Sequence, residues 1–213
     1  MKKLLTIGCL AATVGIVACT NLERSRTLGN PDISATVLAQ QVCSNCHGVE
    51  GTSISPNFPN LAGQTEEYFV LQMTGFRGHS RADPAGFEYM WGLSRGLSDD
   101  QIKGLATYFG KQAPVKNPAA SSVKLEVISA GEAIYKNGVA ESNVPACATC
   151  HGDVGQGNAQ FPRLASQHAD YLTKQLMVFQ RTDERPEGSV MKTIAHGLTE
   201  QNMEDVAAYL QTL

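Results

Sequence analysis

One short motif occurs twice in this 213-residue chain, and the spacing of the two copies constrains the architecture more than any other feature. Cys-x-x-Cys-His stands at residues 43–47 and again at residues 147–151, 104 positions later. The flanking sequence repeats with it. The matched positions are residues 58–64 with 161–167, Tyr68 with Tyr171, Phe76 with Phe179, Met90 with Met191, residues 96–98 with 197–199, and Tyr108 with Tyr209. Such agreement over about 80 residues predicts the same fold twice.

The repeated motif suits covalent attachment of a haem, because each thiol can add to one vinyl group and the adjacent imidazole can bind the iron. The candidate residues are the cysteines Cys43, Cys46, Cys147 and Cys150 and the histidines His47 and His151. A zinc half-site would need a second ligand pair close by. A dithiol redox pair would follow a strand of a βαβ unit, which the sequence does not suggest. Two covalently bound haem c groups are therefore predicted.

The ligand opposite each histidine decides what a haem iron does, because a thioether there stabilises Fe(II), whereas an open position admits other ligands. Met90 lies 43 residues after His47, and Met191 lies 40 residues after His151, in matched sequence frames. Met73, Met177 and Met203 have no methionine at the equivalent position of the other repeat. Met90 and Met191 are therefore the predicted sixth ligands.

A ligating imidazole usually donates its other ring N–H to a carbonyl or carboxylate. Pro59 and Pro162 follow their histidines by 12 and 11 residues and are candidate carbonyl acceptors, although prolines also occur there as ordinary turn residues. Candidates to reach the haem propionates, with core and surface roles as alternatives, are Tyr68, Tyr171, Gln64, Gln167, Arg77, Arg95 and Trp91. The remaining histidines, His79, His168 and His196, are expected to be solvated or capping residues.

The first 18 residues have the pattern of a secretory signal, with Lys2 and Lys3 before a short apolar run. The run ends in Ile-Val-Ala-Cys at residues 16–19, like the lipobox of a bacterial lipoprotein. We therefore predict a signal peptide over residues 1–18 and a lipid-modified mature N-terminus at Cys19. Cleavage by an ordinary signal peptidase would instead leave Cys19 as a free thiol. The expected location is the periplasm of a Gram-negative bacterium, with the lipid chains holding the protein to a membrane.

The mature chain divides into four parts: a flexible tether at 19–31, a first domain at 32–112, a Pro-rich linker at 113–124 and a second domain at 125–213. No stretch alternates convincingly like a strand, so the predicted fold is all-α, with each domain a small helical unit built around its haem. The formal net charge is −3, and no basic stripe suggests nucleic acid as a partner.

Two Cys-x-x-Cys-His-Gly motifs, each followed by Pro-x-Leu-Ala-x-Gln, a Tyr-bearing segment, a Met and Gly-Leu-[Ser/Thr], resemble the diheme cytochrome c4 family. The resemblance covers residues 32–213. It implies two cytochrome c domains related by a pseudo-twofold, with both irons His/Met ligated, in a periplasmic electron carrier. The chain departs from this pattern in its lipobox and in Ser166, which replaces the Gly63 of the first repeat.

The leading hypothesis is a carrier of single electrons from a quinol-oxidising complex or dehydrogenase to a terminal oxidase or reductase. One alternative is an electron-accepting haem subunit of a dehydrogenase, such as a flavocytochrome sulfide dehydrogenase. Another is a diheme enzyme such as a thiosulfate dehydrogenase or peroxidase. An enzyme of that kind needs an exchangeable position on one iron, and the presence of both Met90 and Met191 argues against it.

Overall fold

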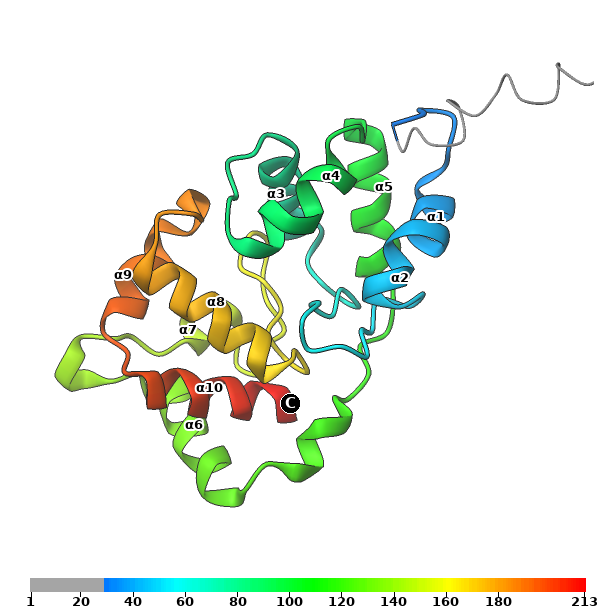
Figure 1. The fold of residues 1–213 in the computed structure, drawn as a ribbon. Coiled ribbons are helices and arrows are strands. Elements are labelled where there is room, and N and C mark those ends of the chain that lie inside the picture. The colour runs from blue at the N-terminus through cyan, green and yellow to red at the C-terminus, as the bar shows by residue number, and fades with distance from the viewer. Residues whose placement is uncertain (1–28) are drawn as a thin grey trace, which may run out of the picture.

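The computed structural model describes residues 29–213, which form two helical domains lying side by side (Figure 1). The predicted signal peptide, the lipidation site Cys19 and most of the predicted tether lie outside the described residues. Within 29–213 the only β-type pairings are two isolated bridges, Val139 with Val144 and Asn158 with Phe161. The all-α prediction is therefore confirmed.

In the first domain a nearly continuous helical segment leads into the first Cys-x-x-Cys-His motif. The helices of the whole first domain are α1 (Ala35–Leu38), a π-helical turn (Ala39–Cys43), α2 (Ser44–His47), α3 (Glu66–Arg77), a second π-helical turn (Gly86–Met90), α4 (Trp91–Ser94) and α5 (Asp99–Gly110). Helix α5 begins at the capping box formed by Ser98 and Gln101, in which each side chain bonds the other residue's backbone N–H.

The second domain repeats this order with one change before its motif. Its helices are α6 (Leu125–Asn137), α7 (Ala148–His151), α8 (Ala169–Arg181), α9 (Ser189–His196) and α10 (Glu200–Thr212), with short 3-10 turns at Pro118–Ser122, Ala140–Ser142 and Pro186–Gly188. Helix α6 ends at Gly138, which has φ 74°, a conformation that costs glycine little. A loop then separates α6 from the motif, whereas the first domain has continuous helix.

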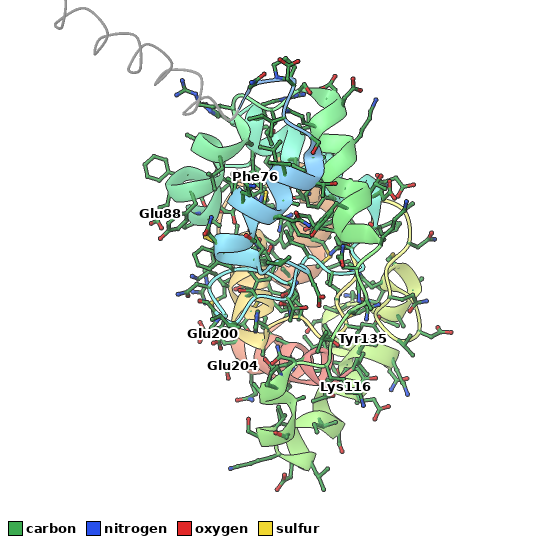
Figure 2. The ribbon with its side chains drawn as sticks, turned by 90° about the vertical axis from the view of Figure 1, so that its right-hand side faces the viewer. Phe76, Glu88, Lys116, Tyr135, Glu200 and Glu204 are labelled. Atoms are coloured by element: carbon green, nitrogen blue, oxygen red, sulfur yellow. The ribbon has the colours of Figure 1, made fainter. Side chains whose placement is uncertain are left out.

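Each domain has its own hydrophobic core. Ile102, Leu105 and Phe109 of α5 are at most 1% exposed in the first core, and Tyr135 and Met203 are fully buried in the second. In Figure 2 the labelled Phe76 and Tyr135 lie within their domains. Burying one such large apolar side chain contributes about 1.5–3 kcal/mol, so each domain has a separate source of stability.

Helices α6 and α10 pack closely because a glycine stands at their contact. A Cβ added to Gly131 of α6 would come within 2.0 Å of the carbonyl oxygen of Asp205 in α10. Only glycine allows this approach of the two backbones. No helix between residues 29 and 213 has the length and apolar character needed to cross a bilayer.

The two domains meet along α3 and α8 and along the loops that follow the two motifs. Ala82 of the first domain donates its backbone N–H to the carbonyl of Glu184 in the second at 2.7 Å. The side chains of Gln64 and Gln167 each cross the boundary to bond backbone atoms of the other domain. These reciprocal contacts fit the pseudo-twofold relation that the family resemblance implies.

Candidate haem-binding sites

Each motif occupies the last turn of a helix and is followed by a glycine with positive φ. Gly48 has φ 76° and Gly152 has φ 83°. A Cβ on Gly48 would lie 2.2 Å from the carbonyl oxygen of Thr52, so a side chain there would clash with backbone. The glycine after each histidine therefore lets the chain turn sharply away from the motif and begin the loop that passes over the imidazole.

The two imidazoles have matched environments. Nδ1 of His47 lies 2.9 Å from the carbonyl oxygen of Pro59, and Nδ1 of His151 lies 3.0 Å from that of Pro162. Since a carbonyl oxygen can only accept, each Nδ1 carries the proton, and Nε2 keeps its lone pair. Both histidines are buried, and that burial lowers the pKa of each ring. Each is therefore a neutral imidazole with a metal-binding nitrogen free.

The four motif cysteines are partly buried and line one cavity of about 690 Å³ that extends across both domains. Burial raises the pKa of Cys43 and of Cys147 to about 11. This rise shows that both sulfur atoms lie in apolar surroundings, as the wall of a porphyrin site requires.

Met90 and Met191 line the same cavity as the motifs. Met90 ends the second π-helical turn, and Met191 lies in the first turn of α9. Of the other candidates, Met203 is fully buried in the second core, and Met73 is in the first core with part of its surface at the cavity wall. The structure therefore brings the predicted methionine, histidine and cysteines of each domain to one cavity.

A polar cluster that the sequence did not reveal lies where the cavity meets the domain boundary. Arg81 is 3% exposed and donates from Nε and Nη2 to the two carboxylate oxygens of Asp83, at 2.8 and 3.1 Å. Its Nη1 donates to Gln72 Oε1 at 2.6 Å, and its guanidinium lies over the ring of Phe76, 4.4 Å from the centroid. The Arg81 charge is thus compensated in a site closed to solvent.

Arg185 of the second domain occupies the equivalent position. It donates to Glu187 at 3.0 Å and to Gln175 at 2.6 Å, and it lies over Phe179 at 4.4 Å. The two guanidinium groups also bond across the boundary, Arg81 to Gln175 at 3.2 Å and Arg185 to Gln72 at 2.8 Å. These four residues form one interdomain cluster with approximate twofold symmetry.

One hydrogen-bond donor of the cluster has no acceptor among the described residues. Nε2 of the buried Gln72 has no partner among the described residues, whereas Nε2 of Gln175 bonds Asp83. The hydroxyl of Tyr68 accepts from Arg185, and both Tyr68 and Tyr171 line the cavity. A buried donor without an acceptor is unfavourable, so this end of the cavity suits an acidic group.

The residues present therefore fit a haem in each domain. The cavity wall is mainly apolar, as a porphyrin requires, and each domain offers two thiols, an imidazole and a thioether. The unpaired Nε2 of Gln72 at the boundary suits a propionate group. Bound haem supplies a centre that takes up and releases one electron.

Three of the candidates for the propionates take the alternative core or surface roles. Arg77 instead bonds the carbonyl of Leu97 and the carboxylate of Asp99 at the surface, and Arg95 is exposed. Trp91 donates to the carbonyl of Arg81 and stacks on His79. None of Arg77, Arg95 and Trp91 lines the cavity.

His168 is the N-cap residue of α8, as one of its two expected roles required, but its side chain makes no capping bond and is not solvated. His168 is 8% exposed, and its ring contacts the side-chain nitrogen of Asn117 and the carbonyl of Ser53, both at 3.1 Å. Because Asn117 lies in the predicted linker and Ser53 in the first domain, His168 ties three parts of the chain together. The motif histidines follow a recognisable pattern of cysteines, whereas no pattern in the sequence around His168 indicates that Asn117 and Ser53 are its partners.

The matched geometry of the two sites is that of a known family. A family model of cytochrome c matches residues 34–112 and 128–213. This chain belongs to the cytochrome c family. Cytochrome c4 of Azotobacter vinelandii is 36% identical over 181 residues, which cover 81% of this chain and 84% of that protein. The crystal structure of reduced recombinant cytochrome c4 from Pseudomonas stutzeri superposes with TM-score 0.72 and 33% identity, covering 85% of this chain and all of that one.

Cytochrome c4 is thus the subfamily to which the chain belongs, as the sequence motifs predicted. A more distant relative, a thiosulfate dehydrogenase electron acceptor from Stutzerimonas stutzeri, is 31% identical over 174 residues, covering 80% of this chain and 78% of that protein. Like these relatives, the chain is a diheme electron-transfer cytochrome with covalently bound haem c, a carrier and not an enzyme, and its partners are redox proteins.

Proposed function

We propose that this cytochrome carries single electrons through two haems of closed coordination, ligated by His47 and Met90 in the first domain and by His151 and Met191 in the second. Cys43 and Cys46, and likewise Cys147 and Cys150, form the thioether bonds. The observation that supports this most directly is that both predicted ligand sets reach one cavity, each with its imidazole Nδ1–H held by a proline carbonyl.

The same proposal places the protein in the periplasm of a Gram-negative bacterium, attached to a membrane by lipid at Cys19. Its donor is a quinol-oxidising complex or a dehydrogenase, and its acceptor is a terminal oxidase or reductase. The relative named as an electron acceptor of thiosulfate dehydrogenase favours a second candidate donor, a dehydrogenase that oxidises a sulfur compound. Co-purification of the protein with a dehydrogenase that oxidises a sulfur compound would support the second candidate, and co-purification with a quinol-oxidising complex would support the first.

Spectroelectrochemical titration of the holoprotein beside Met90→Ala and Met191→Ala tests the ligand assignment. Each substitution is expected to lower one of the two reduction potentials, because loss of the thioether removes a ligand that stabilises Fe(II). Each should also remove about half of the deep-red thioether-to-ferric absorption band. Met73→Leu is the matched control, because Met73 also reaches the cavity wall. An unchanged band in both alanine variants would contradict the assignment.

A further inference from the structure

The peptide group between Pro59 and Asn60 makes a hydrogen bond at each of its two ends. Its carbonyl, that of Pro59, accepts from His47 Nδ1 at 2.9 Å. Its N–H, that of Asn60, donates to Oε1 of Gln167 at 2.8 Å. Gln167 belongs to the second domain, so one peptide connects the imidazole of the first domain with a side chain of the second.

The second domain has the mirror arrangement. The carbonyl of Pro162 accepts from His151 Nδ1 at 3.0 Å, and the N–H of the same peptide, that of Arg163, donates to Oε1 of Gln64 at 2.7 Å. Gln64 belongs to the first domain. Each imidazole is therefore held through a peptide that the opposite domain completes.

The two glutamine amides have a fixed orientation. Nε2 of Gln167 donates back to the carbonyl of Asn60 at 3.0 Å, and Nε2 of Gln64 donates to the carbonyl of Arg163 at 3.1 Å. Each amide thus pairs with both backbone groups of one residue, as a neighbouring strand would. Gln64 is 8% exposed and Gln167 is 5% exposed, so water does not compete for these bonds.

Hydrogen bonds at the two ends of one peptide strengthen each other. Donation from the N–H increases electron density on the carbonyl oxygen, which then accepts more strongly, by an order of 10–30% per bond in condensed-phase estimates. A stronger acceptor at Nδ1–H makes an imidazole a more basic metal ligand. A more basic imidazole favours Fe(III) over Fe(II) and lowers the reduction potential.

We propose that Gln64 and Gln167 are positioning residues for the ligating imidazole of the opposite domain, so that each domain sets the potential of the other domain's haem. The inference rests on the proposed ligation by His47 and His151. The cross-domain pattern distinguishes it from ordinary interface packing, because a packing residue affects its own domain at least as much as its neighbour.

The test is the reduction potential of each haem in the holoproteins Gln167→Leu and Gln64→Leu, with the two irons distinguished by their haem methyl NMR resonances. Gln167→Leu is expected to raise the potential of the first-domain haem, and Gln64→Leu that of the second. The net free energy of one hydrogen bond limits the change in the ratio of oxidised to reduced haem to about fivefold. At 59 mV per tenfold for one electron, this corresponds to about 40 mV.

Three further measurements support the design. Gln167→Asn shortens the side chain by one C–C bond, which withdraws the amide oxygen but keeps the site polar. It should shift the potential of the first-domain haem in the same direction as Gln167→Leu, and it serves as the second variant if Gln167→Leu folds poorly. The NMR resonance of the His47 Nδ1–H should change its chemical shift in both Gln167→Leu and Gln167→Asn. Gln211→Leu is the matched control: Gln211 is also a buried glutamine of the second domain, and its Oε1 accepts from the backbone N–H of Ala169 at 2.9 Å, but it does not line the cavity that both motifs share.

The outcomes separate this inference from the proposed function. A shift confined to the domain that carries the substitution, an equal shift of both haems, or no shift while the thioether band stays intact would overturn the inference and leave the ligand assignment standing. A wild-type protein that lacks the thioether band would refute the ligand assignment, and this inference with it.

Discussion

Removal of the negative charge of Asp83 should destabilise the protein far more than the same change at its symmetry-related partner. Asp83 is 1% exposed and accepts three hydrogen bonds, two from Arg81 and one from Gln175. Asp83→Asn leaves the guanidinium of Arg81 buried beside a neutral group. Loss of one partner of a buried ion pair typically costs about 3–5 kcal/mol, because the remaining charge stays away from water.

Glu187→Gln provides the matched control. Glu187 occupies the equivalent place beside Arg185, but its side chain is 19% exposed, compared with 1% for Asp83. Solvent can therefore replace part of the lost interaction, and the expected cost is below about 1 kcal/mol. The comparison keeps the chemistry of the substitution constant, while the carboxylates differ in burial and in the number of hydrogen bonds they accept, three for Asp83 and one for Glu187.

The assay is urea unfolding of the holoproteins at neutral pH, followed by far-ultraviolet and haem-region circular dichroism. Asp83→Asn should lower the unfolding free energy by about 3–5 kcal/mol with an unchanged dependence on denaturant. Equal costs for Asp83→Asn and Glu187→Gln would refute the conclusion that solvent exclusion gives Asp83 its importance.

The difference between wild type and Asp83→Asn should also depend on pH. Burial alone would raise the pKa of Asp83, but the hydrogen bonds and charge of Arg81 hold it below the ordinary value. The stabilisation is therefore complete above the unfolded pKa of about 3.9 and is lost as the pH falls through the lower folded pKa. The two proteins should become more alike in that acid range, and a gap that widens there would contradict this sign.

Other consequences can be measured independently. Burial lowers the pKa of His168, whose protonation would bring a second N–H against the amide of Asn117. The unfolding free energy should therefore fall as the pH drops below about 6.5, less steeply in His168→Gln, and equal slopes in urea titrations would refute this. Gly131→Ala should cost about 1–3 kcal/mol despite alanine's helix preference, whereas Gly92→Ala, which meets no atom within 4 Å, should cost nothing. Cys19→Ser should move the protein from the membrane to the soluble fraction, and unchanged fractionation would exclude the lipid anchor.

Most of the fold could be predicted because the same motifs occur in both halves of the chain, so that the two copies can be compared position by position. The matched motifs and the pairing of Met90 with Met191 identify equivalent positions without any knowledge of contacts. The capping box at Ser98 also follows from local chemistry, since its two partners stand three residues apart. Features that depend only on residues close together in the sequence could be predicted in this way.

The interdomain contacts could not be predicted, because their partners lie far apart in the sequence. Arg81 and Arg185 look like surface residues until α3 and α8 bring the two glutamines Gln72 and Gln175 between them. Each of these residues has its equivalent in the other repeat at nearly the same offset, and that match is the signal that could have indicated the cluster. His168 has no such counterpart, since the equivalent position in the first repeat is Thr65.

The reciprocal glutamine pairing means that neither half of this molecule is a self-sufficient small cytochrome. Cutting the chain between residues 113 and 124 would separate the two cores without damaging either one, yet each fragment would lose the amide that holds its proline–histidine contact. The two domains therefore meet at the same peptides that hold the imidazoles of His47 and His151.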